Sequence, residues 1–598
     1  MEKVLERSEV KKEDTWDVES IYRSIKDWQE DYDDCRSKIT NLEEQKDTFL
    51  KDSKHFKDFI LLSDKVERQL EKIYVYANLR NNEDTTNTTY QELLGKGLNL
   101  YQEYSEKTNF VVPLILKEDK KKIESFIDSE EELHPFRHTI EDILRYQGHN
   151  LSEVEEKVIA AYNTVLSSAS KTADMLMDAD MRFGNIKDED SRKVELTQSN
   201  YGIYLRSNDR RVRKDAFEKM NQVFGSFKNT LTSTLESTIK CNSTTARLKN
   251  FHSSLELSLF ENNIPVSLYH NLISVVHNNL EPLYKYFNIK KNKLGLKEFH
   301  LYDGYASTVT DISKKYSFEE GKELVINALS VLGEDYIETL KKAFTERWID
   351  IYPNRGKTSG AYSSGTYDTK PFVLLNYTED YNDVSTLAHE LGHSMHSYLS
   401  NTHNDHTNAS YPIFLAEIAS TVNELLLSYY MEHHASTTEE KLAILNERLD
   451  TFKGTIYRQT MFAEFELYMH DAVDKGEVLT AEKLCDKYYE LNKLYFGDDV
   501  VVDNEIRYEW LRIPHFYRPF YVYQYATGLS IASYIAKNIL EKKEGFRDKY
   551  LEFLSSGGKD DPLEILKIID VDLTDTKVFE ESLTMFKETV NTFEHLQS

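Results

Sequence analysis

The chain has 598 residues, a formal net charge of −28 and 40% hydrophobic residues. That much apolar material, mixed with 29% charged residues, indicates a large folded protein and excludes a disordered chain. The negative charge would repel phosphate backbones and anionic lipid surfaces, so we expect neither nucleic acid nor membrane as a partner.

Cysteine content and the N-terminus bear on the compartment. The three cysteines, Cys35, Cys241 and Cys485, are far apart and form no CxxC pair, which excludes a disulfide framework and a thiolate zinc cage. The N-terminus lacks the apolar core of a signal peptide, and no apolar stretch is long enough to cross a bilayer. We therefore expect a cytoplasmic protein. A monomer is the default expectation for its oligomeric state.

Long helices are predicted along most of the chain. Only ten prolines and 21 glycines occur, and apolar residues recur at helical spacing, as at Leu70, Ile73 and Tyr74. A polar stretch at 188–200 precedes a helix start at Ser207. The sequence predicts a mainly α fold with an N-terminal helical lobe at residues 1–200 and a second domain at 201–598, which carries the chemistry described below.

One region departs from the helical pattern. Residues 349–352 and 372–377 are β-prone runs, and the glycines and serines of 356–365 between them predict the turns of a small sheet. A free sheet edge around 360–362 could bind an extended peptide through backbone hydrogen bonds, which would tolerate many side chains. The alternative is that this segment only supports a loop.

The helix that follows carries a stripe of histidines. Residues 382–383 offer a cap, and 384–399 is amphipathic. Its histidines, His389, His393 and His396, lie at i, i+4 and i+7, on the side opposite the apolar face. We expect this helix to carry the chemistry.

His389-Glu390-Leu-Gly-His393 is an HExxH motif. Two imidazoles one turn apart can each place a nitrogen about 2.0–2.1 Å from one zinc ion. Glu390 is rotated about 100° from His389, so it does not ligate but can reach a water on the metal and accept its proton. The motif predicts one Zn²⁺ per chain, with Glu390 as general base.

A catalytic zinc needs a third protein ligand. Three ligands from one straight helix would be unusual, so we expect His396 to be a packing residue or to support the ligands. The apolar helix after Pro412 carries Glu417 and Glu424, seven residues apart on one face. A carboxylate buried among apolar neighbours needs a partner, which is either the metal or an ordinary ion pair. Glu417 is the predicted ligand, and Glu424 would orient a ligating histidine.

The motifs together resemble a known family. Residues 389–396 (HELGHSMH) and 414–424 (FLAEIASTVNE) resemble the thimet oligopeptidase family of zinc metallopeptidases. More narrowly, 512–528 (RIPHFYRPFYVYQYATG) and 360–365 (GAYSSG) are similar to its oligoendopeptidase F branch. The similarity covers most of the chain from about residue 200, and more loosely the segment before it.

The resemblance implies a large helical zincin-type peptidase with a small β-sheet beside the active-site helix and a deep channel that admits unfolded oligopeptides. It assigns His389, His393 and Glu417 as ligands and Glu390 as base. It also implies a histidine and tyrosines that donate to the oxyanion, which the reaction requires because negative charge develops on the carbonyl oxygen. His515 and Tyr521 are the first candidates and Tyr525 the next. Aromatic packing is the expected role of the other rings in this segment, those of Tyr517, Phe520 and Tyr523.

The predicted activity is hydrolysis of internal bonds in short peptides. One alternative is an exopeptidase of the same architecture, such as a dipeptidyl carboxypeptidase, which would need a site for the terminal carboxylate. The other is a non-enzymatic helical binding protein that carries an accidental HExxH.

Overall fold

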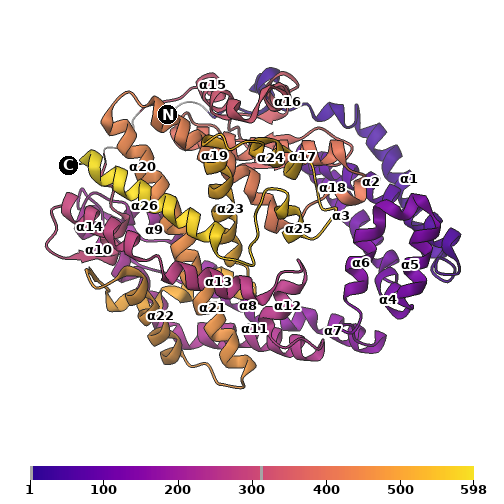
Figure 1. Ribbon diagram of the computed structural model, residues 1–598, viewed down its shortest axis with the longest axis horizontal. Coiled ribbons are helices and arrows are strands. Elements are labelled where there is room, and N and C mark those ends of the chain that lie inside the picture. The colour runs from indigo at the N-terminus through magenta and orange to yellow at the C-terminus, as the bar shows by residue number, and fades with distance from the viewer. Residues whose placement is uncertain (1–3, 310–313, 598) are drawn as a thin grey trace. The chain divides into compact units, whose positions relative to one another are not determined.

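Helices dominate the computed structural model (Figure 1), which describes residues 4–309 and 314–597. The chain forms two compact units, each assembled from three separate segments. Unit 1 contains residues 4–150, 314–430 and 535–570, and unit 2 contains 151–309, 431–534 and 571–597. The predicted mainly α fold with small sheets is confirmed.

Unit 1 holds the N-terminal helices and the helix with the histidine stripe. Its α-helices are α1 (Ile25–Glu44), α2 (Ser53–Glu83), α3 (Thr88–Thr108), α4 (Val111–Lys117), α5 (Lys120–Ser129), α6 (Arg137–Arg145), α15 (Phe318–Leu329), α16 (Glu334–Thr345), α17 (Tyr381–His403), α18 (His406–Ala409), α24 (Phe546–Leu554) and α25 (Pro562–Lys567). Two further helices, α19 (Ile413–His434) and α23 (Tyr523–Leu540), carry the chain from one unit to the other.

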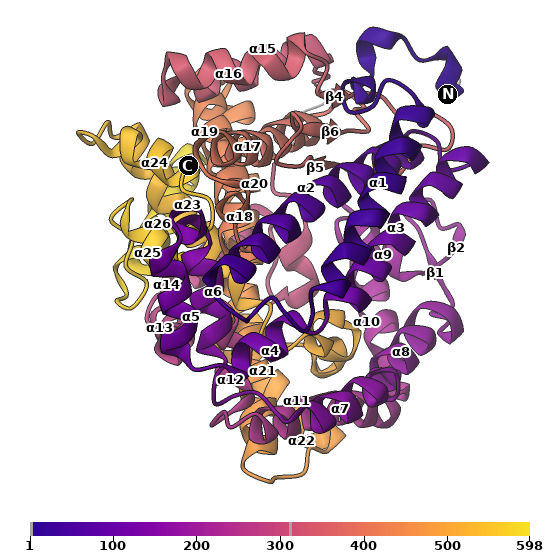
Figure 2. The ribbon, with the colours of Figure 1, turned by 90° about the vertical axis from the view of Figure 1, so that its right-hand side faces the viewer.

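A three-stranded sheet accompanies α17 in unit 1. Strand β6 (Phe372–Leu374) lies in the centre, parallel to β4 (Ile349–Asp350) and antiparallel to β5 (Tyr362–Ser364). Figure 2 shows the sheet beside α17, which contacts both β5 and β6. The two predicted strands are confirmed, and β5 lies in the segment for which we predicted turns and a free sheet edge around 360–362.

The N-terminal helices share a hydrophobic core with this sheet. Phe372 and Leu374 of β6 are fully buried in the same cluster as residues of α1, α2 and α3. The ring of Trp16 meets that of Phe372 edge-on, with centroids 6.2 Å apart. The packing therefore groups residues 4–150 with the α17 segment, which differs from a single division of the chain at residue 200.

Unit 2 is also helical. Its α-helices are α7 (Glu153–Leu166), α8 (Ser168–Asp174), α9 (Gln198–Leu205), α10 (Arg210–Ser226), α11 (Lys228–Leu248), α12 (Ser254–Phe260), α13 (Val266–His277), α14 (Glu281–Lys293), α20 (Thr438–Phe452), α21 (Arg458–Asp474), α22 (Ala481–Phe496) and α26 (Lys577–Gln597). Its strands form two short pairs, antiparallel β1 (Asn185–Lys187) with β2 (Lys193–Glu195), and parallel β3 (Phe299–His300) with β7 (Val500–Val501).

Two further observations concern the described residues. None of their helices combines the length and the apolar character needed to span a bilayer. All three cysteines are free thiols, and Cys35 and Cys485 are buried.

Candidate metal centre

Helix α17 begins earlier than its sequence suggested. The side chain of Asp380 caps the helix by accepting a hydrogen bond from the Asp383 backbone N–H, and the Asp383 side chain accepts one from the Asp380 backbone. This reciprocal capping box starts the helix at Tyr381 and satisfies backbone donors that would otherwise be unpaired. The predicted cap at Asn382-Asp383 is therefore wrong by two to three residues, although Asp383 does take part.

The apolar face of α17 lies where we predicted it. Val384, Leu387, Leu391 and Met395 are all fully buried. The predicted stripe of three histidines on the opposite side is wrong for His396, which is 1% exposed and stacks on the ring of Tyr411 at 3.7 Å. Burial lowers the pKa of His396 to about 3. This neutral, stacked imidazole agrees with the packing role that spacing suggested.

Close approach of two helices brings Glu417 to the histidines. Gly392 of α17 faces the backbone of α19, and a Cβ at this position would lie 2.6 Å from the Ser420 Cα. The Asn423 side chain donates to the Ala388 carbonyl at 3.0 Å and ties the two helices together. The glycine of the HExxH motif thus permits a helix separation that a larger residue would prevent.

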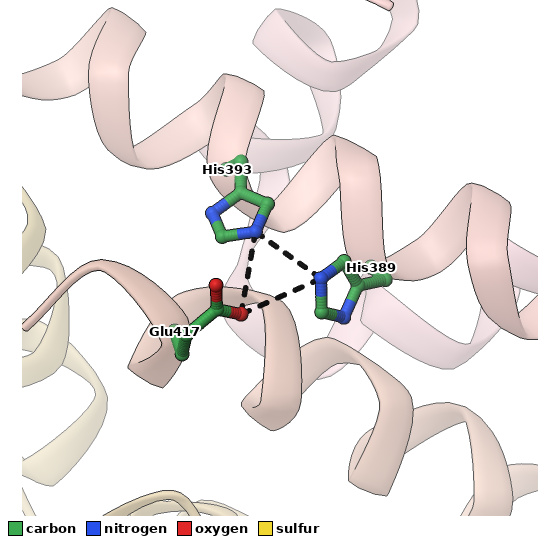
Figure 3. A group of neighbouring side chains, drawn as sticks. All are labelled: His389, His393 and Glu417. Atoms are coloured by element: carbon green, nitrogen blue, oxygen red, sulfur yellow. Dashed lines mark hydrogen bonds and ion pairs between the residues drawn. The ribbon is translucent and has the colours of Figure 1, made fainter. Parts of the chain in front are cut away.

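Three ligand atoms converge on one point (Figure 3). The Nε2 atoms of His389 and His393 are 3.2 Å apart, and each lies 3.5 Å from Oε2 of Glu417. Ligands bound about 2.0–2.1 Å from a tetrahedral zinc ion would lie about 3.3–3.4 Å from one another. The two nitrogens and one oxygen therefore fit a zinc ion that retains an open position.

Glu424 contacts the far side of His389. Its Oε1 lies 2.5 Å from His389 Nδ1, so that Nε2 is left to face the metal position. Burial lowers the pKa of His389, but the hydrogen bond and negative charge of Glu424 outweigh it, and the net pKa is raised. A carboxylate behind a ligating histidine holds the ring orientation and increases its basicity.

Glu417 is more exposed than we expected. Its side chain is 53% accessible, so the expectation that it is buried among apolar neighbours is wrong. The side chain points towards the two histidines of α17 (Figure 3). Hydrogen bonding to His393 lowers the Glu417 pKa and keeps the carboxylate charged.

Glu390, which lies between the two histidines in the sequence, is buried and only 6% exposed. Burial raises the pKa of its carboxyl group, while the nearby histidines and a backbone hydrogen bond from Ser363 of β5 act in the opposite direction. The Ser363 hydroxyl also lies 2.9 Å from that of Ser394 on α17, which fixes β5 against the helix. A carboxylate held in this way suits proton transfer.

A cavity of about 780 Å³ opens over these residues. Its walls include His389, Glu390, His393 and Glu417, together with β5. They also include residues that we did not assign to a site from the sequence, namely Glu71 and Tyr74 of α2, Tyr101 of α3, and His406 and Tyr411. No local motif marks the N-terminal residues, because only the folding of α2 and α3 onto the sheet places them here.

His515, Tyr521 and Tyr525 gather in a group of their own in unit 2. The ring centroids of Tyr521 and Tyr525 are 5.5 Å apart, and His515 Nε2 lies 3.4 Å from the Tyr525 hydroxyl. Burial, with the nearby Arg518, lowers the pKa of His515 and favours the neutral imidazole. The Tyr517 hydroxyl is instead 2.8 Å from that of Thr234 on α11.

Known proteins match this chain along almost its whole length. The model for peptidase family M3 matches residues 203–585, and the one described as Oligopeptidase F matches 115–183. Oligopeptidase PepF of Bacillus subtilis (strain 168) is 41% identical over 591 residues, which cover 99% of this chain and 88% of that protein.

Two solved structures also match this chain along nearly its whole length. The crystal structure of oligoendopeptidase-F from Enterococcus faecium is 34% identical, covers 95% of this chain and 99% of its own, and has a TM-score of 0.73. A crystal structure from Chlamydophila abortus is 38% identical, covers 99% of this chain and 100% of its own, and has a TM-score of 0.95. The chain therefore belongs to peptidase family M3, in its oligoendopeptidase F branch, and is a metallopeptidase.

Proposed function

We propose that this protein is a zinc-dependent oligoendopeptidase in which His389, His393 and Glu417 hold one Zn²⁺ and Glu390 is the general base. Peptide hydrolysis follows from the family, which is zinc-dependent in general. The strongest support for the proposal is the triangle of ligand atoms with edges of 3.2–3.5 Å, which matches the spacing of ligands on tetrahedral zinc.

The edge of the small sheet suits an extended peptide. Among the described strands, β5 pairs only with β6, so no strand occupies its other edge, where backbone groups other than the Ser363 N–H bonded to Glu390 can pair with a peptide. Residues 361–365 also line the cavity. Binding through the main chain would tolerate varied side chains, as an oligopeptidase requires.

The reaction then needs few groups. A bound zinc ion would acidify a water molecule and polarise the scissile carbonyl. Glu390 accepts the proton of the attacking water and passes it to the leaving amine. His515 and Tyr521, with Tyr525 next, donate hydrogen bonds to the developing oxyanion, an assignment that rests on the sequence motif. No covalent enzyme intermediate is required.

Replacing Glu390 by Gln tests the base. We expect Glu390→Gln to retain about one zinc per chain by elemental analysis and to lose ~10²–10⁴-fold in turnover of an internally quenched peptide. Glu338→Gln changes an exposed glutamate of α16 in the same way and serves as the matched control. Near-normal turnover of pure Glu390→Gln would contradict the assignment, as would absence of zinc from the wild type.

Product mapping separates the endopeptidase from the exopeptidase alternative. We expect internal cleavage of a peptide of about ten residues whose N-terminus is acetylated and whose C-terminus is amidated. A dipeptidyl carboxypeptidase needs the free terminal carboxylate, so cleavage that is lost on amidation would favour that alternative. The proposed monomer and cytoplasmic location stay predictions.

A further inference from the structure

A second cavity, of about 310 Å³, lies wholly within unit 2. It is formed where the end of α9, helix α14 and the turn at Leu301–Tyr305 meet the end of α20, the beginning of α21, the end of α22 and Arg512. None of its residues belongs to the metal centre or to the group of His515, Tyr521 and Tyr525. A volume near 300 Å³ is at the lower end of the range for small-molecule sites.

One wall of the cavity is a π-helical turn. Residues Lys453–Tyr457 form this turn between α20 and α21. Lys453, Gly454, Tyr457 and Arg458 all line the cavity. Single π-turns within α-helices are rare, and those that occur are frequently found at functional sites.

Cationic side chains outnumber carboxylates around this cavity. Arg206, Lys453, Arg458 and Arg512 line it, whereas Asp450 is the one carboxylate among its described lining residues. This excess is unusual for a chain whose overall formal charge is −28. Such a concentration of positive charge in a concave site favours an anionic ligand.

The nearby carboxylates are already shared. Asp450 accepts a hydrogen bond from Lys453 and lies 3.9 Å from the fully buried Lys290. Burial, with the charge of Lys453 next in order, lowers the pKa of Lys290 to about 7. One carboxylate thus serves two amino groups, so the positive charge on this side is only partly compensated.

The arginines also have fewer carboxylate partners than positive charges. Glu509 lies 2.8 Å from Arg458 and 3.5 Å from Arg512. Arg206 is exposed and forms no ion pair with any described residue, whereas the Nε of Arg512 is buried and has no hydrogen-bond partner. The guanidinium group of Arg206 thus remains for an oxyanion, which such groups bind well through paired hydrogen bonds, and Arg512 adds positive charge beside it.

The rest of the cavity wall is apolar. The hydroxyls of Tyr457 and Tyr495 bond to Asn279 and to Glu464, so both tyrosines contribute mainly their rings to the lining. Phe287 and Phe496, which stack on each other at 5.1 Å, complete this side. A ligand that fills the cavity would therefore have an apolar body as well as a charged head.

We infer that this cavity is a binding site for a small organic anion, with a phosphate or carboxylate head held by Arg206, Lys453 and Arg512 and an aromatic or branched aliphatic body against Tyr457 and Phe496. The site is independent of the proposed peptidase chemistry.

Calorimetric titration of the zinc-loaded, full-length enzyme tests this inference. The probes are phenyl phosphate and phenylacetate, with phenylacetamide as the uncharged control and inorganic phosphate as a competitor without an apolar body. We expect at least one aromatic anion to bind with one site per chain, inorganic phosphate to compete more weakly, and phenylacetamide not to bind. Absence of saturable binding by both anions would overturn the inference.

Two variants locate the binding. A Cβ at Gly454 would meet no atom within 4 Å, so Gly454→Leu can fill the cavity without disturbing the backbone, and we expect it to abolish binding. Arg206→Ala should weaken binding about tenfold, as expected for loss of a charge-assisted hydrogen bond.

Matched controls come from the same unit. Gly202→Leu changes an exposed glycine of α9 that also has no atom within 4 Å, and Arg247→Ala changes an exposed arginine at the end of α11. Neither should alter binding. Binding that persists in Gly454→Leu would mean that the metal centre or the surface holds the probe, and the inference would be wrong.

Discussion

At the scale of single residues, Glu424 shows how a group that would not touch zinc can control its site. Its carboxylate lies 2.5 Å from His389 Nδ1, on the side of the ring away from Nε2. Because such partners orient the ligating ring, their loss typically weakens metal binding. Glu424 lies seven residues after Glu417, and this spacing already predicted from the sequence that both residues lie on one face of α19.

We predict that Glu424→Gln will bind zinc about 10–100-fold more weakly than the wild type. The neutral amide accepts a weaker hydrogen bond from His389 and removes the charge that makes the ring more basic. Competition with a chelator of known affinity measures the change, with Glu338→Gln as control. Unaltered zinc affinity would show that Glu424 does not support the ligand.

Replacing Tyr521 by Phe tests whether a single hydroxyl group binds the oxyanion. If its hydroxyl donates to the oxyanion, Tyr521→Phe should lower kcat by ~10²–10³-fold with little change in KM, since the bond forms mainly in the transition state. Steady-state kinetics on the quenched peptide gives both constants.

Tyr517→Phe is the matched control, because the Tyr517 hydroxyl is engaged with Thr234. Its loss should affect stability by about 1 kcal/mol rather than turnover. Full activity in Tyr521→Phe, with a loss of kcat in Tyr525→Phe, would transfer the role to Tyr525.

At the scale of secondary-structure elements, the contact between α17 and α19 decides whether the third ligand reaches the first two. Gly392 faces Ala419 and Ser420 at backbone distances that exclude any Cβ. The HExxH helix and the helix with Glu417 are each recognisable in the sequence, but their separation depends on this one small residue.

We predict that Gly392→Ala will destabilise the protein by about 1–3 kcal/mol, because the added methyl group meets backbone atoms that cannot move away without shifting α19. Zinc affinity should fall as well, since Glu417 moves with the helix. Thermal denaturation and metal titration measure the two effects.

Gly95→Ala is the control for this change. Gly95 lies within α3 with no atom within 4 Å of an added Cβ, so alanine should be neutral or stabilising by up to about 1 kcal/mol. A Gly392→Ala variant as stable as Gly95→Ala, with normal zinc affinity, would contradict the packing argument.

At the scale of the whole molecule, unit 1 brings together segments that are hundreds of residues apart. His406 of α18 bonds through Nδ1 to Asp64 of α2 at 2.7 Å, and its Nε2 lies 3.4 Å from Glu71. The ring also meets that of Tyr367 edge-on. These contacts join the N-terminal helices to the segment that follows the metal helix.

This junction should make stability depend on pH. Burial lowers the His406 pKa, but Asp64 and Glu71 outweigh it and raise the pKa from 6.5 to about 9, with Glu67 a further nearby acid. A raised pKa in the folded state stabilises the protein fully below about pH 6.5, and this contribution is lost as the pH rises through about 9.

We predict that His406→Gln will lower stability by about 1–2 kcal/mol at pH 6, after allowance for partial solvent screening, and by much less at pH 10. Urea denaturation at both pH values measures the difference. Asp64→Asn should remove part of the same pH dependence, because that carboxylate helps to raise the pKa. An equal loss of stability at pH 6 and pH 10 would contradict the role of the charge.

The sequence by itself determined the features that depend on local periodicity. His389 and His393 share one face because the α-helix repeats every 3.6 residues, and the same geometry places Glu417 and Glu424 together. The buried apolar face of α17 and the strands within 349–352 and 372–377 followed from equally local patterns.

Only the tertiary structure decided which distant surfaces meet. It exposed Glu417 to the cavity, buried His396 against Tyr411, and made Glu71, Tyr74 and Tyr101 part of the wall above the metal centre. It also gathered Arg206, Lys453 and Arg512 from segments that share no motif. These outcomes depend on the packing of whole helices, since long-range contacts arise from the sum of many apolar surfaces that no single stretch of sequence specifies.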